Sequence, residues 1–132
     1  MEKDIIKQII ENDPFLKYLG IKILELKEGY CKLSVDFKHE LTRSGEILNG
    51  GVISSLADAA GGCAVLTLNQ RKNQVTIDLN ISFLRPIKNG PVTVEGRVTK
   101  VGKSLSFADM QIFDGEGAKC AVAKGTWFFV SF

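Results

Sequence analysis

The spacing of hydrophobic positions changes along the chain and separates helical segments from strands. Residues 4–12 place four isoleucines at helical spacing, and Asp13 followed by Pro14 is typical of the cap and first turn of a second short helix, which ends near Gly20. Other segments alternate between polar and apolar residues, as half-buried strands do. We predict strands over residues 21–27, 30–38, 74–83, 92–101, 104–113 and 118–132.

In two of these strands the order of apolar and polar residues predicts which way individual side chains face. Residues 74–83 alternate strictly, which places Val75 on the apolar face and Thr76 on the polar one. In the next-to-last strand the apolar phase slips between Phe107 and Ala108, which predicts a β-bulge there. The turns between the strands after residue 68 are short, so we expect these strands to be antiparallel neighbours.

Residues 50–68 form a long apolar segment that contains one acid, Asp58. A helix that is apolar on every side must be covered on every side, and an ionised carboxylate inside it is costly unless it is paired, hydrogen-bonded or in use. The glycines, the serines and Asp58 make this segment a poor membrane span, although its length is nearly sufficient. We therefore predict a buried helix, which a sheet can cover fully only by wrapping strongly or with a second copy of the molecule.

Composition narrows the class of protein. A chain of 132 residues is expected to form one domain, residues 1–132. The net charge of +2 and the scattered Lys and Arg residues argue against a nucleic-acid partner. Three widely spaced cysteines without a Cys-x-x-Cys motif argue against a disulfide framework or a zinc site. Because the N-terminus also lacks the apolar run of a signal peptide, we expect a cytoplasmic protein with reduced thiols and no membrane partner.

The candidate catalytic groups lie at the start of the apolar helix and two turns further along it. The glycine pair Gly50–Gly51 leaves backbone N–H groups open to a ligand. Gly50 and Asp58 are eight residues apart, which corresponds to about 12 Å along a helix. An oxyanion donor and a base that act on one carbonyl must each lie about 3 Å from it. A site that uses both residues therefore requires two chains, with their helices packed antiparallel.

The chain resembles the hotdog-fold acyl-CoA thioesterases of the phenylacetate-pathway type. The resemblance rests on Asn-Gly-Gly-Val-Ile-Ser-Ser-Leu-Ala-Asp at residues 49–58 and on the strand 75–86, which ends in Phe-Leu-Arg-Pro. It implies an α+β hotdog fold, in which an antiparallel curved sheet wraps around a long central helix. It also implies a homodimer with a continuous sheet, or a dimer of dimers, that hydrolyses an acyl-CoA substrate without a cofactor or metal.

The resemblance assigns roles to individual residues. The Gly50 N–H would polarise the thioester carbonyl, and Asp58 of the opposite subunit would be the general base or the nucleophile. Thr76 matches a hydroxyl that orients the water or the carboxylate. Asn49 stands where the family usually has histidine; it can donate a hydrogen bond but cannot titrate. The candidate substrate-binding residues are Gly51, Arg43, Arg85, Lys88 and Lys103.

Several alternatives stay open. Asp58 could be a structural hydrogen-bonding group, and the basic residues could be solubilising charge rather than a rim for the phosphates of coenzyme A. Arg43 or Ser44 could occupy the family's upstream amide position, with Glu46 as a further acid. A non-catalytic acyl-CoA-binding or sensing module is the alternative function. A dehydratase would need a histidine, and His39, the one in the chain, is poorly placed for it.

Overall fold

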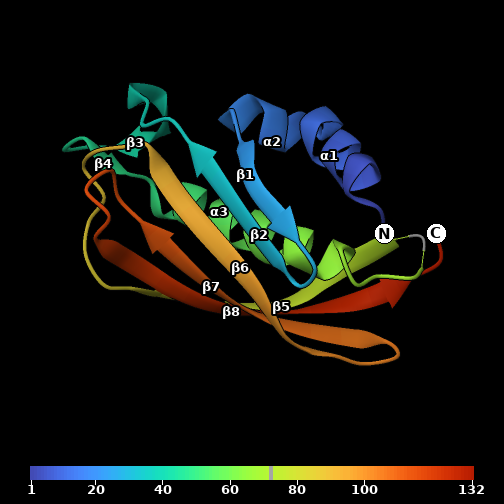
Figure 1. Cartoon of the computed structure of the whole chain (residues 1–132). Coiled ribbons are helices and arrows are strands. Elements are labelled where there is room, and N and C mark those ends of the chain that lie inside the picture. The colour runs from blue at the N-terminus through green and yellow to red at the C-terminus, as the bar shows by residue number, and fades with distance from the viewer. Residues whose placement is uncertain (72) are drawn as a thin grey trace.

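The computed structural model describes residues 1–71 and 73–132. One antiparallel sheet curls around a long helix, α3 (Gly50–Leu66), as predicted (Figure 1). In the described chain the sheet has the strand order β1-β2-β6-β7-β8-β5, so β1 and β5 form its edges. Its strands are β1 (Lys22–Lys27), β2 (Tyr30–Val35), β5 (Asn73–Phe83), β6 (Val92–Val101), β7 (Leu105–Phe113) and β8 (Lys119–Val130). The strand predicted over residues 30–38 therefore ends three residues early, at Val35.

The helices at the N-terminus follow the local signals of the sequence. After α1 (Lys3–Asn12), Asp13 caps α2 (Pro14–Leu19) by accepting hydrogen bonds from the backbone N–H groups of Phe15 and Leu16 at 3.1 and 3.0 Å. Gly20 ends α2 with a φ of 78°, a conformation that glycine adopts without strain. The predicted cap and stop of this helix are confirmed.

Between β2 and α3 the chain forms a short helical turn and a small hairpin. These elements are η1 (His39–Leu41), β3 (Thr42–Arg43) and β4 (Ile47–Leu48). The hairpin leads directly into α3, and the Leu48 N–H donates to the Ile87 carbonyl at 2.9 Å. This bond ties the start of α3 to the loop that follows β5.

One side of α3 packs against the sheet and the other side is left uncovered. On the covered side, the Trp127 ring lies so close to Gly61 that a Cβ on this glycine would overlap it. On the uncovered side, Ser54, Ser55 and Asp58 are partly exposed. The sheet of one chain thus curls around only part of the helix circumference, so full wrapping by its own sheet is excluded and cover by a second copy stays a prediction.

The strict alternation predicted for β5 is also wrong. The register with β8 shifts between Thr76 and Asp78, which makes Ile77 the extra residue of a β-bulge. Before the bulge, Val75 pairs with Phe128 on the outer face, where both side chains are exposed. Thr76 consequently faces inward, toward α3, instead of outward with the polar residues.

A second bulge lies on the strand opposite the predicted one. The register between β6 and β7 shifts between Val98 and Lys100, so the extra residue belongs to β6. In β7 the alternation continues through Phe107, which is 37% exposed, and Ala108, which is 1% exposed. The apparent phase slip in the sequence reflects an outward-facing phenylalanine, not a bulge in β7.

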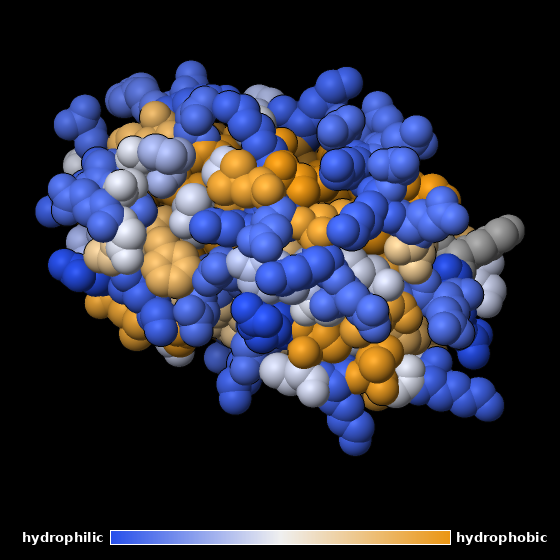
Figure 2. Space-filling view, in the orientation of Figure 1, coloured by the Kyte–Doolittle hydropathy of each residue, from blue (hydrophilic) through white to orange (hydrophobic). Residues whose placement is uncertain are grey.

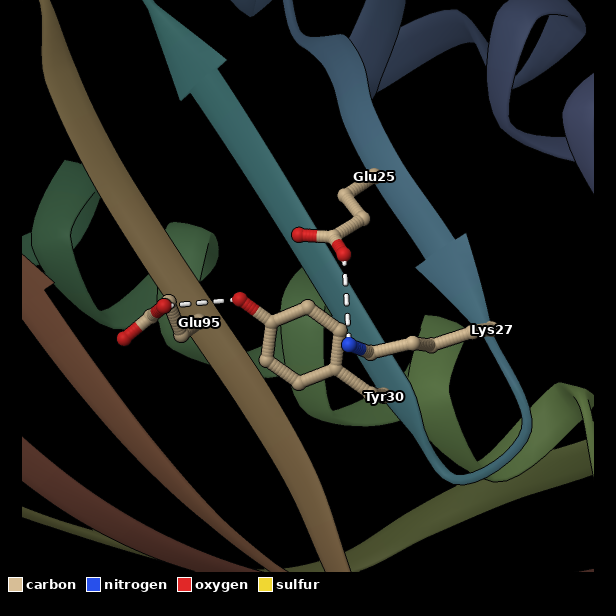
Figure 3. Close-up of polar contacts among 4 residues, drawn as sticks. All are labelled: Glu25, Lys27, Tyr30 and Glu95. Carbon is tan, nitrogen blue, oxygen red and sulfur yellow. Dashed lines mark hydrogen bonds and ion pairs between the residues drawn. The ribbon is translucent and has the colours of Figure 1, made fainter.

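Much of the face turned toward the viewer in Figure 1 is covered by hydrophilic side chains, with hydrophobic patches between them (Figure 2). A polar cluster lies on this side, where β1, β2 and β6 meet (Figure 3). The Tyr30 hydroxyl donates to Glu95 Oε1 at 2.7 Å, and Lys27 and Arg97 lie 4.9 and 4.6 Å from the ring centroid. Burial, and then the hydrogen bond to Glu95, raise the pKa of Tyr30 well above its ordinary value.

The apolar composition of α3 raises the question of a membrane span. Within residues 1–71 and 73–132, no helix combines the length and apolarity needed to cross a bilayer.

Candidate active site

Asp58 and Thr76, two of the predicted site residues, are in direct contact within one chain. The Thr76 hydroxyl donates a hydrogen bond to Asp58 Oδ1 at 2.6 Å. This contact depends on the bulge at Ile77, which turns Thr76 toward the helix. Asp58 Oδ2 has no hydrogen-bond partner in the described part of the chain, so one carboxylate oxygen is held and the other is available to a ligand or water.

A cavity of about 230 Å³ lies beside this pair. It runs along α3 from Asp58 toward the end of the helix, and α1 and the first residues of β5 border it. Apart from Asp58 and Thr76, its lining consists of Ile9, Ile10, Asp13, Ala59, Gly62, Cys63, Leu66, Asn73, Gln74 and Trp127. The lining combines apolar side chains of α1, α3 and β8 with polar side chains of β5, so the cavity offers apolar contact beside a carboxylate at one end.

Among the cavity residues that sequence reasoning missed, Gln74 and Trp127 carry N–H groups that matter for its polarity. Gln74 Nε2 donates to the Gly62 carbonyl at 2.8 Å, and its Oε1 accepts from Asn69 Nδ2 at 3.1 Å. This glutamine therefore fixes the start of β5 against α3. Gln74 lies two residues before Thr76, so the strand period places the two side chains on the same face. Trp127 could have been singled out as the one tryptophan of the chain.

The start of α3 presents a free backbone donor. Asn49 Oδ1 accepts from the Gly51 N–H at 2.7 Å, and the Asn49 carbonyl accepts from the N–H groups of Val52 and Ile53 at 3.0 and 3.1 Å. Among the described residues the Gly50 N–H finds no acceptor. Asn49 thus caps the helix with its side chain. The free Gly50 N–H lies at the positive end of the helix dipole, where it can donate to an anionic group.

The predicted substrate-binding residues do not form one cluster in a single chain. Arg43, Arg85 and Lys88 are exposed at the end of the sheet where α3 begins, in β3 and in the loop after β5 (Figure 1). Lys103 lies at the opposite end, where its turn borders a cavity together with Leu68, just after α3. One chain therefore offers three cations near the helix start, with Lys103 apart from them.

The remaining reactive side chains lie away from Asp58 or are buried. His39 is exposed in η1. Cys31, Cys63 and Cys120 are free and buried, which fits reduced structural thiols. The neighbouring Cys63 and then burial raise the pKa of Cys31 well above its ordinary value.

Comparisons with known proteins agree with this architecture. The sequence profile of the thioesterase superfamily matches residues 45–121. A protein of Saccharolobus solfataricus named "Putative esterase" is 43% identical over 122 residues, which are 92% of this chain and 81% of the relative.

Solved structures show the same fold. The E. coli PaaI protein from the phenylacetic acid degradation operon has a TM-score of 0.87 at 27% identity, over 94% of this chain and 89% of that one. A thioesterase from Haemophilus influenzae has a TM-score of 0.87 at 26% identity, over 99% and 92%. The predicted hotdog fold is confirmed, and thioester hydrolysis is the activity of the class. The chain belongs to the thioesterase superfamily.

Proposed function

We propose that the protein hydrolyses an acyl-CoA thioester to the free acid and coenzyme A, at a site shared by two subunits. The observation that carries this proposal is the Asp58 carboxylate, held at one oxygen by Thr76 and open at the other, on the uncovered side of α3 beside an apolar cavity. Each subunit would contribute Asp58 to one site and the Gly50 N–H to the other.

A homodimer with antiparallel α3 helices brings the two groups together. The uncovered side of α3 carries small residues, Ser54 and Ser55 among them, which permit a close approach of a second helix. The edge strand β5 is 11 residues long, and its bulged Ile77 is 56% exposed. The unpaired backbone groups of such an edge strand, with apolar side chains beside them, can pair with another chain. A second β5 would make the sheet continuous.

The chemistry needs few groups because a thioester carbonyl is already electrophilic. The free Gly50 N–H would donate to the carbonyl oxygen and stabilise the negative charge that develops there, with support from the helix dipole. Asp58 Oδ2 would either take a proton from the attacking water or attack the carbonyl itself. In both cases the thiolate of coenzyme A leaves and is protonated; in the second, water then hydrolyses the acyl–Asp58 anhydride, which releases the free acid and restores the carboxylate. Thr76 would hold the carboxylate in position.

The rest of the substrate would extend in two directions. The acyl group would enter the cavity beside Asp58, and Gly51, at the same helix start, would permit close approach of the thioester. Arg43, Arg85 and Lys88 would attract the phosphates of coenzyme A, and Lys103 would join them only from the second subunit. The Asn49 side-chain amide, whose oxygen caps α3, would retain its NH2 group for the substrate. The buried free thiols fit a cytoplasmic location.

A hydrolysis screen over short, medium, long and aryl acyl-CoAs tests this proposal. We expect turnover by the wild type, and a decrease in kcat of about 10²–10⁴-fold in Asp58→Asn. Asp109→Asn, an exposed aspartate on β7 and away from the β5 edge, is the matched control. Undiminished hydrolysis by a folded Asp58→Asn protein would contradict the role of Asp58. Acyl-CoA binding without turnover by the wild type would favour a non-catalytic binding module.

A further inference from the structure

The indole N–H of Trp127 belongs to a buried side chain and has no acceptor in the described part of the chain. Trp127 is 2% exposed, and its ring packs between β8 and α3. Within the described chain, Trp127 Nε1 takes part in no hydrogen bond, and it is also absent from the fully enclosed unsatisfied atoms. A buried indole N–H ordinarily finds a partner, so this donor must face a space that a ligand or water can reach.

That space is the cavity beside Asp58. Trp127 and Gly62 both line it, and a Cβ on Gly62 would lie 3.2 Å from Trp127 Nε1. Because glycine has no side chain, Gly62 leaves the Trp127 N–H accessible from the cavity. The neighbouring Thr76 and Gln74 side chains are engaged elsewhere, because Thr76 donates to Asp58 Oδ1 and Gln74 donates to the Gly62 carbonyl.

The cavity has room for a short acyl group. An enclosed cavity of about 150 Å³ holds benzene, and this one has about 230 Å³ and also opens to solvent. Its walls near Trp127 include Ala59, Cys63 and Leu66, which offer hydrophobic contact. An occupant that is apolar along its length but carries one hydrogen-bond acceptor matches these walls best.

We propose that Trp127 is a specificity-determining residue, whose Nε1–H donates to an oxygen on the acyl group of the substrate. The inference rests on the proposed function, since it places the acyl group in the cavity beside Asp58. A short acyl group with a keto, hydroxyl or ether oxygen satisfies the buried donor. A purely aliphatic group of the same length removes water from the N–H and leaves it unpaired, which disfavours its binding.

Kinetics with a matched substrate pair test this preference. Hexanoyl-CoA is compared with 4-oxohexanoyl-CoA and 5-oxohexanoyl-CoA, whose keto oxygens are remote from the thioester. We expect kcat/KM of the wild type to be about tenfold higher for at least one oxo substrate. In Gly62→Ala, whose methyl group would cover Nε1, and in Trp127→Phe, which lacks the N–H, the ratio should fall to about one. Equal kcat/KM values in the wild type, or an unchanged ratio in both variants, would overturn the assignment.

A direct reporter keeps the inference separate from the proposed activity. The chain has one tryptophan, so a ¹⁵N-labelled sample gives a single indole N–H resonance. In Asp58→Asn, chosen to preserve the substrate, we expect this resonance to move downfield on saturation with the preferred oxo substrate and much less with hexanoyl-CoA. If neither acyl-CoA moves it, the inference fails even where the wild type hydrolyses both. If it responds but the wild type shows no turnover, the proposed function fails and the ligand contact stands.

Discussion

Thr76 and Asp58 are joined by a hydrogen bond of 2.6 Å between the edge strand β5 and the central helix α3. A bulge at Ile77 makes this contact possible by turning Thr76 inward. The bond fixes one carboxylate oxygen and leaves the other available for chemistry. A strand irregularity is thereby coupled to the position of the proposed acid–base group, as is common for bulges near active sites.

Removing the Thr76 hydroxyl should slow the chemical step. In Thr76→Val the carboxylate loses its fixed orientation, and we expect kcat to fall about tenfold with little change in KM. Thr76→Ser retains the hydroxyl and should stay close to the wild type. Steady-state kinetics of the two variants make the comparison, and equal rates in both would show that this hydrogen bond does not assist catalysis.

Replacing Gly50 with proline should remove the oxyanion donor and little else. Proline suits the first position of a helix, and Asn49 already has the extended backbone that a residue before proline prefers. The lost N–H has no acceptor in the described chain, so the folded state gives up no hydrogen bond. We expect kcat to fall about 10²–10³-fold while the melting temperature stays within a few degrees. A fully active Gly50→Pro enzyme would exclude this N–H as the donor.

The pKa of Tyr30, raised by burial and by Glu95, predicts a loss of stability at high pH. Above pH of about 10 the unfolded chain releases its phenol proton while the native chain keeps it, so the free energy of unfolding decreases as pH rises. Denaturant titrations at pH 8 to 11 should show a flatter decrease for Tyr30→Phe. Tyr18→Phe, at a residue that is 69% exposed, should follow the wild type. Identical slopes for all three proteins would refute this linkage.

Local signals in the sequence predicted the helices well. Asp13, Pro14 and Gly20 specify the start and end of α2 through contacts with their own neighbours, and no distant residue is needed. The bulge in β5 was not predicted, and the one expected in β7 lies on β6, because a bulge is a property of strand pairing. Ile77 is an extra residue only relative to β8, and Thr99 only relative to β7.

The candidate site was predictable in part. Asp58 and Gly50 follow from motif and spacing, and Thr76 follows from the family resemblance. The contact between Asp58 and Thr76, which are 18 residues apart in the sequence, depends on how β5 packs against α3. Asn49 caps α3 by accepting a hydrogen bond from the Gly51 N–H, a role that needs no titratable side chain. Trp127 escaped notice because an inward aromatic residue on a strand ordinarily signals core packing, and its unpaired N–H becomes visible only when its neighbours are placed.

A hybrid dimer tests the shared site most directly. Chains with Asp58→Asn and chains with Gly50→Pro are co-expressed with different tags, and the mixed dimer is purified. If each site takes Gly50 from one subunit and Asp58 from the other, the mixed dimer contains one intact site and one doubly impaired site. We predict that it recovers about half of the wild-type kcat per dimer, although both parent dimers are nearly inactive. A mixed dimer as inactive as its parents would contradict a site built from two subunits.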